Sequence, residues 1–584
     1  MEVHYSSEKG VQIILALLKK FGIKKIITSP GGTNVSFVVS VQFDPYFEVY
    51  SCVDERSAAY MAVGMATESN EPIVINCTGA TSSRNWMPAL TEAYYRKLPI
   101  LAITSSQVDS RKGQLVAQVT DRSMPPSDVA VKSYHIGLIK DEDDLWDRTI
   151  KVNSAIAYLT KRGGGPVHLN LETCYSQDFS VTTLPDVRQI VHYYDCKNMP
   201  EMPQGKIGIT IGSHREMTVC EQNAIDAFCE RYDAVVLCDH TSGYHGKYRI
   251  QSSLILCQKY LEESEFYRNF ALIINMGEMS GDYFSTIKPK DVWRVSLDDE
   301  VRDKYHKLTK VFALTIEDFF TYYANKGSEK HIEQWQRYNN CYEKLLADMP
   351  ELPYSNAYVA KTLASSVPQG SYVHLGILNS LRCWNLFKLP DTVKSACNVG
   401  GFGIDGVLST AIGASLVNKD KLHFCVLGDL SFFYDLNSVG NRHIGNNLRI
   451  VLINNGIGVE FRTYGHIGDI LKENTNPFVA AEGHFGHKSN KLVKNFMTDL
   501  GFEYLSATNK EELEVVKAKF LSTTNERPIL LEVFTNTEEE KEASTIYRLI
   551  SQDKKAMTTE SIKKRITDVI GKQGIETVKK LLGK

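Results

Sequence analysis

The chain of 584 residues is 43% hydrophobic and 23% charged, with a formal net charge of −3. It is too long for one hydrophobic core, and its length predicts about three domains. The nearly neutral charge gives no electrostatic reason to expect nucleic acid or an anionic membrane surface as a partner. No apolar run reaches the roughly 20 residues that span a bilayer, and the N-terminus lacks the pattern of a signal peptide.

The twelve cysteines are scattered along the chain without a Cys-x-x-Cys pair. Several of them, such as Cys77, Cys238 and Cys425, lie in apolar runs. Zinc sites and disulfide frameworks instead show cysteines at short, regular spacings. We therefore expect reduced core thiols in a cytoplasmic protein.

The first part of the chain alternates helical and strand-like patterns. Apolar residues recur on one helical face over residues 7–21, and Gly22 ends that helix. A strand over residues 23–28 follows and leads into the tight loop Ser29-Pro30-Gly31-Gly32. Further strands are expected at residues 73–77, 100–104 and 167–171. These patterns predict an α/β domain over residues 1–185.

A carboxylate stands where the next helix of this domain begins. Residues 49–53 form a strand pattern, and Asp54-Glu55-Arg56 opens a helical one. Taken alone, Glu55 could simply favour the positive end of the helix dipole, an effect of at most about 1 kcal/mol. Its place one strand and one helix after the Ser29-Pro30-Gly31-Gly32 loop gives it a second interpretation, taken up below.

Two more α/β blocks follow the first. A polar, proline-containing linker at residues 198–205 precedes a middle domain, expected at 200–330, and a polar helical connector over 331–349 leads into a third, at 350–550. Beyond it, residues 553–584 carry two apolar helical stripes and predict a helical extension. The fold class expected is α/β, with three consecutive doubly wound parallel-sheet domains.

The third block carries the most informative motif of the chain. Gly428-Asp429-Leu430-Ser431 follows the apolar run 423–427, and Asn454-Asn455-Gly456 follows the run 449–453. Such runs are typical of central parallel strands, so Asp429 and Asn455 are expected at the carboxyl edge of one sheet, where open α/β sheets bind ligands. A carboxylate and an amide oxygen beside glycines suit a Mg²⁺ that carries a diphosphate.

These motifs resemble those of thiamine-diphosphate enzymes of the decarboxylase group, and their wording is most similar to that of the menaquinone-pathway carboligases, which join decarboxylated 2-oxoglutarate to isochorismate. The resemblance implies pyrimidine-binding, middle and diphosphate-binding domains in that order. It rests on the phrases Ser29-Pro30-Gly31, Asp54-Glu55-Arg56, Pro88-Ala89-Leu90-Thr91-Glu92-Ala93, Gly165-Pro166-Val167-His168-Leu169-Asn170, Gly403-Ile404-Asp405-Gly406, Gly428-Asp429-Leu430-Ser431 and Tyr434-Asp435-Leu436-Asn437.

The resemblance also implies the site. Thiamine diphosphate and Mg²⁺ would be the cofactors, bound between subunits of a homodimer or a dimer of dimers, with Glu55 contributed by the partner subunit. Catalytic roles would fall to Glu55, Gln118 and Glu460, although a solvated helical glutamate is an equal interpretation of Glu460. The metal would be held by Asp429, Asn455 and the backbone carbonyl of Ile457. Cofactor contacts would come from Pro30, Gly31, Glu55, Gly79, Gly401, Phe402, Gly403, Gly428, Asp429, Leu430, Ser431, Asn455, Ile457 and Gly458.

The chain departs from the carboligases where they bind substrate carboxylates. Gly32-Thr33 and Val399 stand where that family carries arginines, and neither Thr nor Val replaces the bidentate fork of Arg. The alternative is that other arginines take over, with Arg84, Arg382 and Arg462 as candidates. The departures predict an acceptor other than isochorismate. A less anionic acceptor, such as a keto or aldehyde sugar, would suit a pocket with Thr33, Asn34 and Glu460.

Three functions remain open at this point. The expected one is decarboxylation of a 2-oxo acid with acyl transfer to a carbonyl acceptor. The first alternative is a simple decarboxylase that releases an aldehyde, and the second is a non-catalytic subunit with the same fold. A nicotinamide dehydrogenase is disfavoured, because no strand is followed by Gly-x-Gly-x-x-Gly with a later acidic residue.

Overall fold

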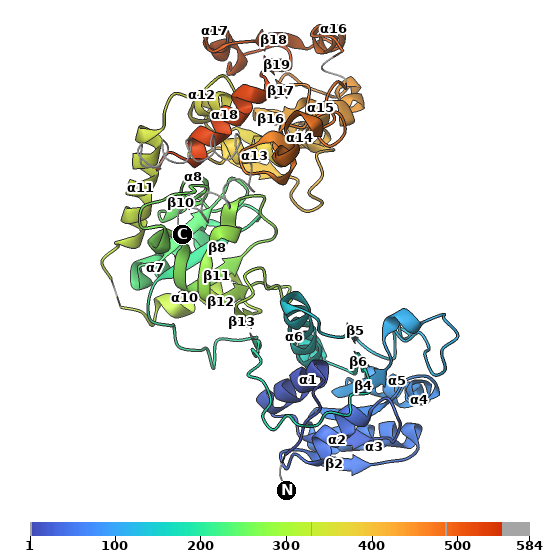
Figure 1. Ribbon diagram of the computed structural model, residues 1–584. Helices are drawn as coiled ribbons and strands as arrows, with labels where there is room; N and C mark the ends of the chain where they lie inside the picture. The colour runs from blue at the N-terminus through green and yellow to red at the C-terminus, as the bar shows by residue number, and fades with distance from the viewer. Residues whose placement is uncertain (1–2, 329, 485–487, 552–584) are drawn as a thin grey trace, which may run out of the picture. The chain divides into compact units, whose positions relative to one another are not determined.

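The computed structural model describes residues 3–328, 330–484 and 488–551. The chain forms two compact units, one of Met1–Tyr194 with Leu297–Ala313 and one of Asp195–Ser296 with Leu314–Lys584 (Figure 1). Helices flank parallel sheets in both units, which confirms the predicted α/β class. The predicted boundaries at 185, 200, 330 and 350 stay predictions, and the extension 553–584 lies outside the described residues.

The first unit contains a six-stranded parallel sheet of order β2-β1-β3-β4-β6-β5. Every residue of its inner strands β4 and β6 is buried, including the polar His168, Asn170 and Glu172. The strands of this sheet are β1 (Lys25–Thr28), β2 (Glu48–Ser51), β3 (Ile73–Thr78), β4 (Ile100–Ser106), β5 (Lys132–Ile136) and β6 (Val167–Glu172). The same unit also contains β7 (Val191–Tyr193) and β13 (Leu308–Phe312), which pair with each other in parallel.

Helices cover both faces of this sheet, as a doubly wound fold requires. Val74 packs with α1 and α6 on one face, and the next residue, Ile75, packs with α3 and α5 on the other. This alternation is the period of two that a strand imposes on its side chains. The helices are α1 (Lys9–Lys20), α2 (Val35–Gln42), α3 (Glu55–Ser69), α4 (Thr81–Asn85), α5 (Met87–Arg96) and α6 (Glu142–Tyr158).

The second unit holds two sheets. Within this unit, the strands of one sheet run in the order β10-β9-β8-β11-β12, and those of the other run in the order β15-β14-β16-β17-β19-β18. The strands are β8 (Ile207–Ile211), β9 (Val235–Cys238), β10 (Arg249–Gln251), β11 (Asn269–Met276), β12 (Lys288–Val295), β14 (Tyr372–Leu375), β15 (Lys394–Cys397), β16 (His423–Gly428), β17 (Leu448–Asn454), β18 (Glu503–Ala507) and β19 (Ile529–Phe534).

The helices of the second unit begin at sequence-encoded caps. Thr218 and Glu221 form a reciprocal capping box at α7, and Asn536 caps α18 ahead of three glutamates in its first turn. The helices are α7 (Val219–Tyr232), α8 (Ser253–Leu256), α9 (Ser264–Arg268), α10 (Ile316–Ala324), α11 (Gln334–Asp348), α12 (Asn356–Leu363), α13 (Asn379–Trp384), α14 (Val407–Val417), α15 (Asp429–Tyr434), α16 (Leu492–Asp499), α17 (Lys510–Phe520) and α18 (Thr537–Arg548).

Helix α11 is the predicted polar connector. The Tyr338 hydroxyl on this helix donates to the Tyr267 carbonyl at 2.6 Å, and the Tyr342 hydroxyl donates to the Leu386 carbonyl at 3.1 Å. The same helix is thus bonded to the segment before β11 and to the segment after α13. None of the helices among the described residues has the length and apolar character needed to cross a bilayer.

Candidate active site

Asp429 lies at the carboxyl edge of the third sheet, directly after β16. It is buried, and its two carboxylate oxygens accept hydrogen bonds from the N–H groups of Leu430 at 2.8 Å and Gly456 at 2.6 Å. Gly428 and Ile453 are register partners in β16 and β17, so the two strands end side by side. The bond to Gly456 therefore joins the loop after β16 to the Asn454-Asn455-Gly456 loop after β17.

The residues at this edge fit a Mg²⁺-bound diphosphate. A carboxylate, the Asn455 amide and the backbone carbonyl of Ile457 are the kinds of oxygen donor that Mg²⁺ takes. A Cβ atom built on Gly428 or on Gly401 would meet no other atom within 4 Å, so the edge keeps open space beside the donors. The assignment of individual ligands stays a prediction.

Phe402 sits in a strained conformation within Gly401-Phe402-Gly403. Its φ of +56° is left-handed, and its side chain is 39% exposed although it is large and apolar. Such a backbone costs about 1–3 kcal/mol and persists where neighbouring structure imposes it. The Ser431 hydroxyl donates to the Ile404 carbonyl, which fastens this turn to the Asp429 loop. This arrangement is compatible with the predicted contact between Phe402 and the cofactor.

Glu460 is not a solvated helical residue, so that interpretation was wrong. Its side chain is buried, and Arg382 from α13 donates to its Oε1. With its amide oriented to satisfy both groups, Asn379 donates to Glu460 Oε2 at 2.7 Å and accepts from the Glu460 N–H at 3.2 Å. A buried carboxylate needs such partners, since its desolvation is otherwise costly. The catalytic role of Glu460 stays a prediction.

Two further carboxylates, Asp239 and Asp282, lie near Arg382, the partner of Glu460. Burial, followed by the charge of Asp239, raises the pKa of Asp282 to about 7. Gly281, just before Asp282, accepts a hydrogen bond from Arg382 Nε at 3.4 Å, and a Cβ built on it would lie 3.9 Å from the Phe402 ring. Sequence reasoning missed this pair, although Asp239 directly follows the buried strand β9, as Asp429 follows β16.

In the first unit, Glu55 is the first residue of α3. The Asp54 side chain caps the helix by accepting from the N–H groups of Arg56 and Ser57. Asn85, at the end of α4, donates to Glu55 Oε2 at 2.9 Å and so orients the half-buried carboxylate. The Asn85 partner was not predicted. Gln118 lies in the loop before β5 with a φ of +64° and an exposed side chain.

The loops around Glu55 are closely packed. A Cβ built on Gly31 would clash with Thr78 at the end of β3, and one built on Gly79 would lie 2.7 Å from Arg122 Nη1. A side chain at either position would require Thr78 or Arg122 to move. Pro30 is exposed beside them. Their predicted contacts with a cofactor remain predictions.

The positions that depart from the carboligase pattern are buried. The Thr33 hydroxyl donates to the Ser105 carbonyl at 2.6 Å, and the Asn34 amide donates to the Ser29 carbonyl at 2.8 Å. Val399 is buried as well. Thr33 and Asn34 are thus bonded within their own unit, which corrects the expectation that they line an acceptor pocket.

Of the three candidate replacement arginines, Arg462 makes its contacts with other side chains of the protein. It is buried, with Nη1 bonded to Asn476 Oδ1 at 2.6 Å and Nε 3.4 Å from Asp469. Arg84 donates to the Asp121 carbonyl in the first unit. Arg382, in the second unit, donates to Glu460 Oε1.

Comparison with known proteins decides the family. Residues 8–124 match the family described as thiamine pyrophosphate enzyme, N-terminal TPP binding domain. The chain is 31% identical over 554 residues to 2-succinyl-5-enolpyruvyl-6-hydroxy-3-cyclohexene-1-carboxylate synthase of Bacteroides fragilis, covering 91% of this chain and 97% of that protein. This chain belongs to the thiamine-diphosphate-dependent enzymes. The synthases of Bacteroides thetaiotaomicron (30%) and Phocaeicola vulgatus (31%) match over 91% and 92% of this enzyme and 97% of their own length.

Family membership confirms the resemblance seen in the motifs. This thiamine-diphosphate enzyme takes thiamine diphosphate with Mg²⁺ as cofactors and belongs to the decarboxylase and carboligase group, with small molecules as substrates. The exclusion of nicotinamide chemistry and the choice of an enzyme over a non-catalytic subunit both agree with it. The identities of the 2-oxo acid and the acceptor are taken up next.

Proposed function

We propose that the enzyme decarboxylates a small 2-oxo acid and transfers the acyl unit to a carbonyl acceptor other than isochorismate. One observation carries the second half: Thr33 and Val399, which replace carboligase arginines, are both buried, and the Thr33 hydroxyl is bonded to the Ser105 carbonyl. Each charge-assisted hydrogen bond contributes roughly 1.5–3 kcal/mol. Two such losses would weaken binding of an anionic acceptor by a few orders of magnitude.

The position of Arg382 supports the proposal that the donor substrate carries a carboxylate, which Arg382 would bind. Its Nη1 is bonded to Glu460 and its Nε to the Gly281 carbonyl, while its Nη2 makes no hydrogen bond with any residue of the described ranges. The side chain is partly exposed. An arginine held in this way on two sides presents its remaining N–H groups to a carboxylate in a fixed orientation.

The residues then divide the work. When bound, thiamine diphosphate supplies the electron sink that lets a 2-oxo acid lose CO₂. Asp429, Asn455 and the Ile457 carbonyl would hold the Mg²⁺ and its diphosphate. Glu55, oriented by Asn85, would hold a proton at a ring nitrogen of the cofactor. Glu460 would move a proton at a substrate oxygen.

We further propose a homodimer, or a dimer of dimers, with each site built from two subunits. Helix α3 exposes Tyr60 (47%) and Met61 (42%) one turn after Glu55. Helix α14 carries no charged residue, and its last residue, Val417, is 88% exposed. An exposed apolar side chain at a helix end is compatible with cover by a second subunit. A cytoplasmic location is supported by the twelve cysteines, all of which are free thiols.

Product analysis tests the reaction. The enzyme is incubated with pyruvate or 2-oxoglutarate, with and without carbonyl acceptors, and CO₂ and products are measured. A joined product that requires the acceptor supports the proposal. Release of free aldehyde alone, whatever acceptor is supplied, would favour the simple decarboxylase. Rapid joining of 2-oxoglutarate to isochorismate would refute the exclusion of that acceptor.

Complementation tests the dimer. Glu55→Gln and Asp429→Ala homodimers should each be inactive. If Glu55 and Asp429 of one site come from different subunits, mixing and re-association should return about a quarter of the wild-type activity, because half the dimers are mixed and each has one intact site. No recovery, with mixed dimers verified by mass, would place both residues of a site in one subunit.

A further inference from the structure

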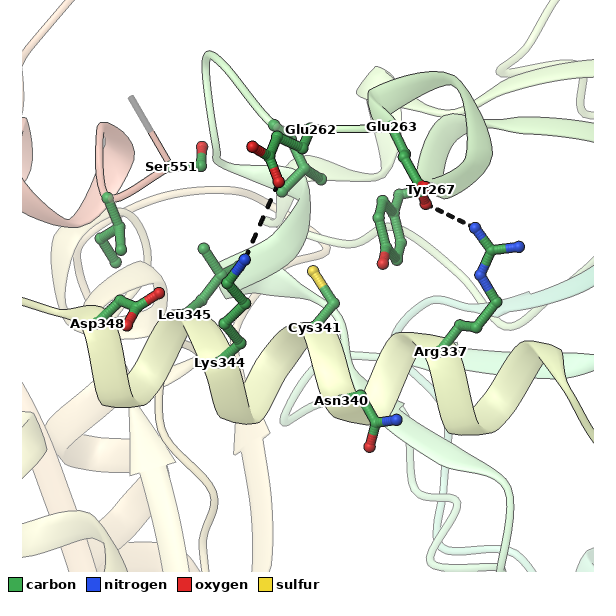
Figure 2. A pocket seen from close by; sticks show the side chains of 12 residues that line it. Glu262, Glu263, Tyr267, Arg337, Asn340, Cys341, Lys344, Leu345, Asp348 and Ser551 are labelled. Carbon is green, nitrogen blue, oxygen red and sulfur yellow. Dashed lines mark hydrogen bonds and ion pairs between the residues drawn. The ribbon is translucent and has the colours of Figure 1, made fainter. Parts of the chain in front are cut away.

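Helix α11 borders two cavities of the second unit that the candidate active site does not use. Figure 2 shows the larger, of about 610 Å³, with the side chains of Arg337 and Lys344 along one face of the helix. Both cations have carboxylate partners, since Arg337 Nη2 lies 2.6 Å from Glu263 and Lys344 Nζ lies 4.0 Å from Glu262. The positive charges of this cavity are therefore compensated within its own lining.

The second cavity lies between α11, strand β10 and the chain that joins α13 to β15. Its volume of about 330 Å³ falls in the range of roughly 300–1,000 Å³ that small-molecule sites occupy. Trp335 and Asn339, four residues apart on α11, share the helix face that lines it. The charged side chains of the lining are Lys247, Arg249, Lys388 and Asp391. With three cations against one carboxylate, the cavity favours an anionic ligand.

Arg249 is the cation best placed to hold that ligand. In the described part of the chain it makes three hydrogen bonds, and none goes to a carboxylate: Nη1 donates to His245 Nδ1 at 3.4 Å, and Nη2 donates to the Asp239 carbonyl at 3.4 Å and to Gln251 Oε1 at 3.3 Å. All three exceed the roughly 2.7–3.2 Å of ordinary N–H···O bonds. A guanidinium that is oriented by long bonds and has no carboxylate among them suits a bidentate anion such as a phosphate.

The two lysines of the lining add to this attraction. Lys247 Nζ lies 3.0 Å from Glu230 and Lys388 Nζ lies 2.8 Å from Glu343, and all four side chains are exposed. Exposed ion pairs of this kind contribute little to stability. A bound anion can therefore recruit either lysine at small cost.

His240 offers a complementary acceptor. Its side chain is buried, and its Nε2 lies 3.0 Å from the carbonyl oxygens of both Trp384 and Phe387, so this nitrogen carries the proton. Burial, followed by the charge of Arg249, lowers the pKa of the ring to about 3 and keeps it neutral. The acceptor nitrogen Nδ1 has no hydrogen-bond partner among the described residues. A ligand hydroxyl would supply one, and an unmet buried polar atom is otherwise costly.

We propose that this cavity binds a small anionic polyol of the class of sugar phosphates. Its phosphate would lie against Arg249 within reach of both lysines, and its hydroxyls would donate to His240 Nδ1 and bond the Asn339 amide. The Trp335 ring, whose Nε1 donates to the Arg249 carbonyl at 3.3 Å, would form the apolar wall. The site shares no residue with those proposed for the diphosphate, the metal or the substrate.

The cavity is bonded to the segment that follows α13. The His240 N–H donates to Asn385 Oδ1 at 3.0 Å, and Gln251 Nε2 donates to the Asn385 carbonyl at 3.0 Å. Helix α13 also carries Arg382 of the candidate active site. A ligand held by Arg249 and His240 would restrain this segment, so its local opening should become rarer.

Calorimetry on the full-length enzyme, saturated with thiamine diphosphate and Mg²⁺, tests the site. Pentose and hexose phosphates are titrated as a panel, each beside inorganic phosphate and its own unphosphorylated sugar. We expect at least one sugar phosphate to bind at least about ten-fold tighter than either fragment, because only the whole ligand meets both Arg249 and His240. No measurable binding in the panel, or equal binding of inorganic phosphate, would overturn the proposal.

Variants separate this cavity from the active site. Arg249→Gln should weaken binding of the tightest sugar phosphate roughly 10- to 100-fold, the range for a lost charge-assisted hydrogen bond, whereas Arg337→Gln in the neighbouring cavity should bind it normally. Lys247→Ser combined with Lys388→Ser, both at exposed positions, should fold normally and weaken binding roughly two- to five-fold. Binding kept in Arg249→Gln but lost in Arg382→Gln would place the ligand in the candidate active site and overturn the assignment.

Hydrogen exchange gives a second readout. Saturation with the tightest sugar phosphate should slow amide exchange in peptides that cover residues 379–387 of the wild-type enzyme, and it should leave exchange unchanged in Arg249→Gln. Without ligand, the two proteins should exchange alike outside the cavity, which shows that the variant is folded. Equal exchange of the wild-type peptides with and without ligand would contradict the restraint on α13.

Discussion

The first and third sheets share one strand order but differ at their carboxyl edges. In each, the first strand is followed outward on one side by the second and on the other by the third, fourth, sixth and fifth. At the first edge, Gly31 and Gly79 are packed against Thr78 and Arg122 with no room for a Cβ. At the third edge, Gly401 and Gly428 face open space.

This difference shows how one scaffold supports two tasks. The first edge holds Glu55, whose Oε2 accepts a hydrogen bond from Asn85 at 2.9 Å. The open edge keeps volume beside an oxygen donor set around Asp429. We therefore propose that the third sheet binds the diphosphate and that the first supplies the group that handles the proton.

The largest effect is expected at the open edge. Asp429→Ala removes both a predicted metal ligand and the acceptor of the Gly456 N–H, which lies 2.6 Å away. Calorimetry should show no measurable binding of thiamine diphosphate with Mg²⁺. Asp420→Ala, at an exposed position before β16, is the control and should bind normally. Unchanged affinity in the Asp429 variant would refute the site.

A smaller effect is expected for Arg382, which we propose binds the substrate and not the cofactor. Arg382→Gln should raise the KM for the 2-oxo acid roughly 10- to 100-fold, the range for a lost charge-assisted hydrogen bond. Because Glu460 would be left buried without its charged partner, the double variant Arg382→Gln with Glu460→Gln serves as the folding control and should keep the high KM. Arg442→Gln, at an exposed position, should leave KM unchanged. A wild-type KM in both Arg382 variants would exclude the role.

The smallest effect concerns pH and stability. The pKa of Asp282 is raised to about 7, so the folded protein retains a proton that the unfolded chain releases above its ordinary value near 4. The free energy of unfolding should therefore fall as pH rises from about 4 to about 7 and flatten above. Burial raises the pKa of Glu540 to about 7 with the same sign.

Asp282→Asn should reduce that slope, seen as a Tm change of a few degrees across the window by scanning calorimetry. Glu542→Gln, exposed on the same helix as Glu540, should leave it unchanged. An Asp282 variant with the wild-type slope would show that this carboxyl is ionised in the folded enzyme throughout the window.

The sequence predicts the positions of site residues that directly follow a recognisable strand or helix pattern. Asp429 and Asn455 could be placed because each follows a buried apolar strand, and Glu55 because Asp54 begins a helix after another strand. The pairing of Arg382 with Glu460 could not, since it joins residues 78 positions apart in a geometry set by how α13 packs. The burial of Thr33 and Asn34 could not be predicted either. It depends on hydrogen bonds to Ser105 and Asn76, which lie on neighbouring strands.

One measurement tests the division between the two edges most directly. In Glu55→Gln, binding of thiamine diphosphate with Mg²⁺ by calorimetry should stay close to wild type, because the diphosphate site lies on the third sheet. Exchange of the cofactor's C2 proton, followed by NMR, should slow by at least about 100-fold, the range for lost acid–base assistance. Exchange at the wild-type rate with intact binding would contradict the account, because Glu55 would then have no part in proton transfer.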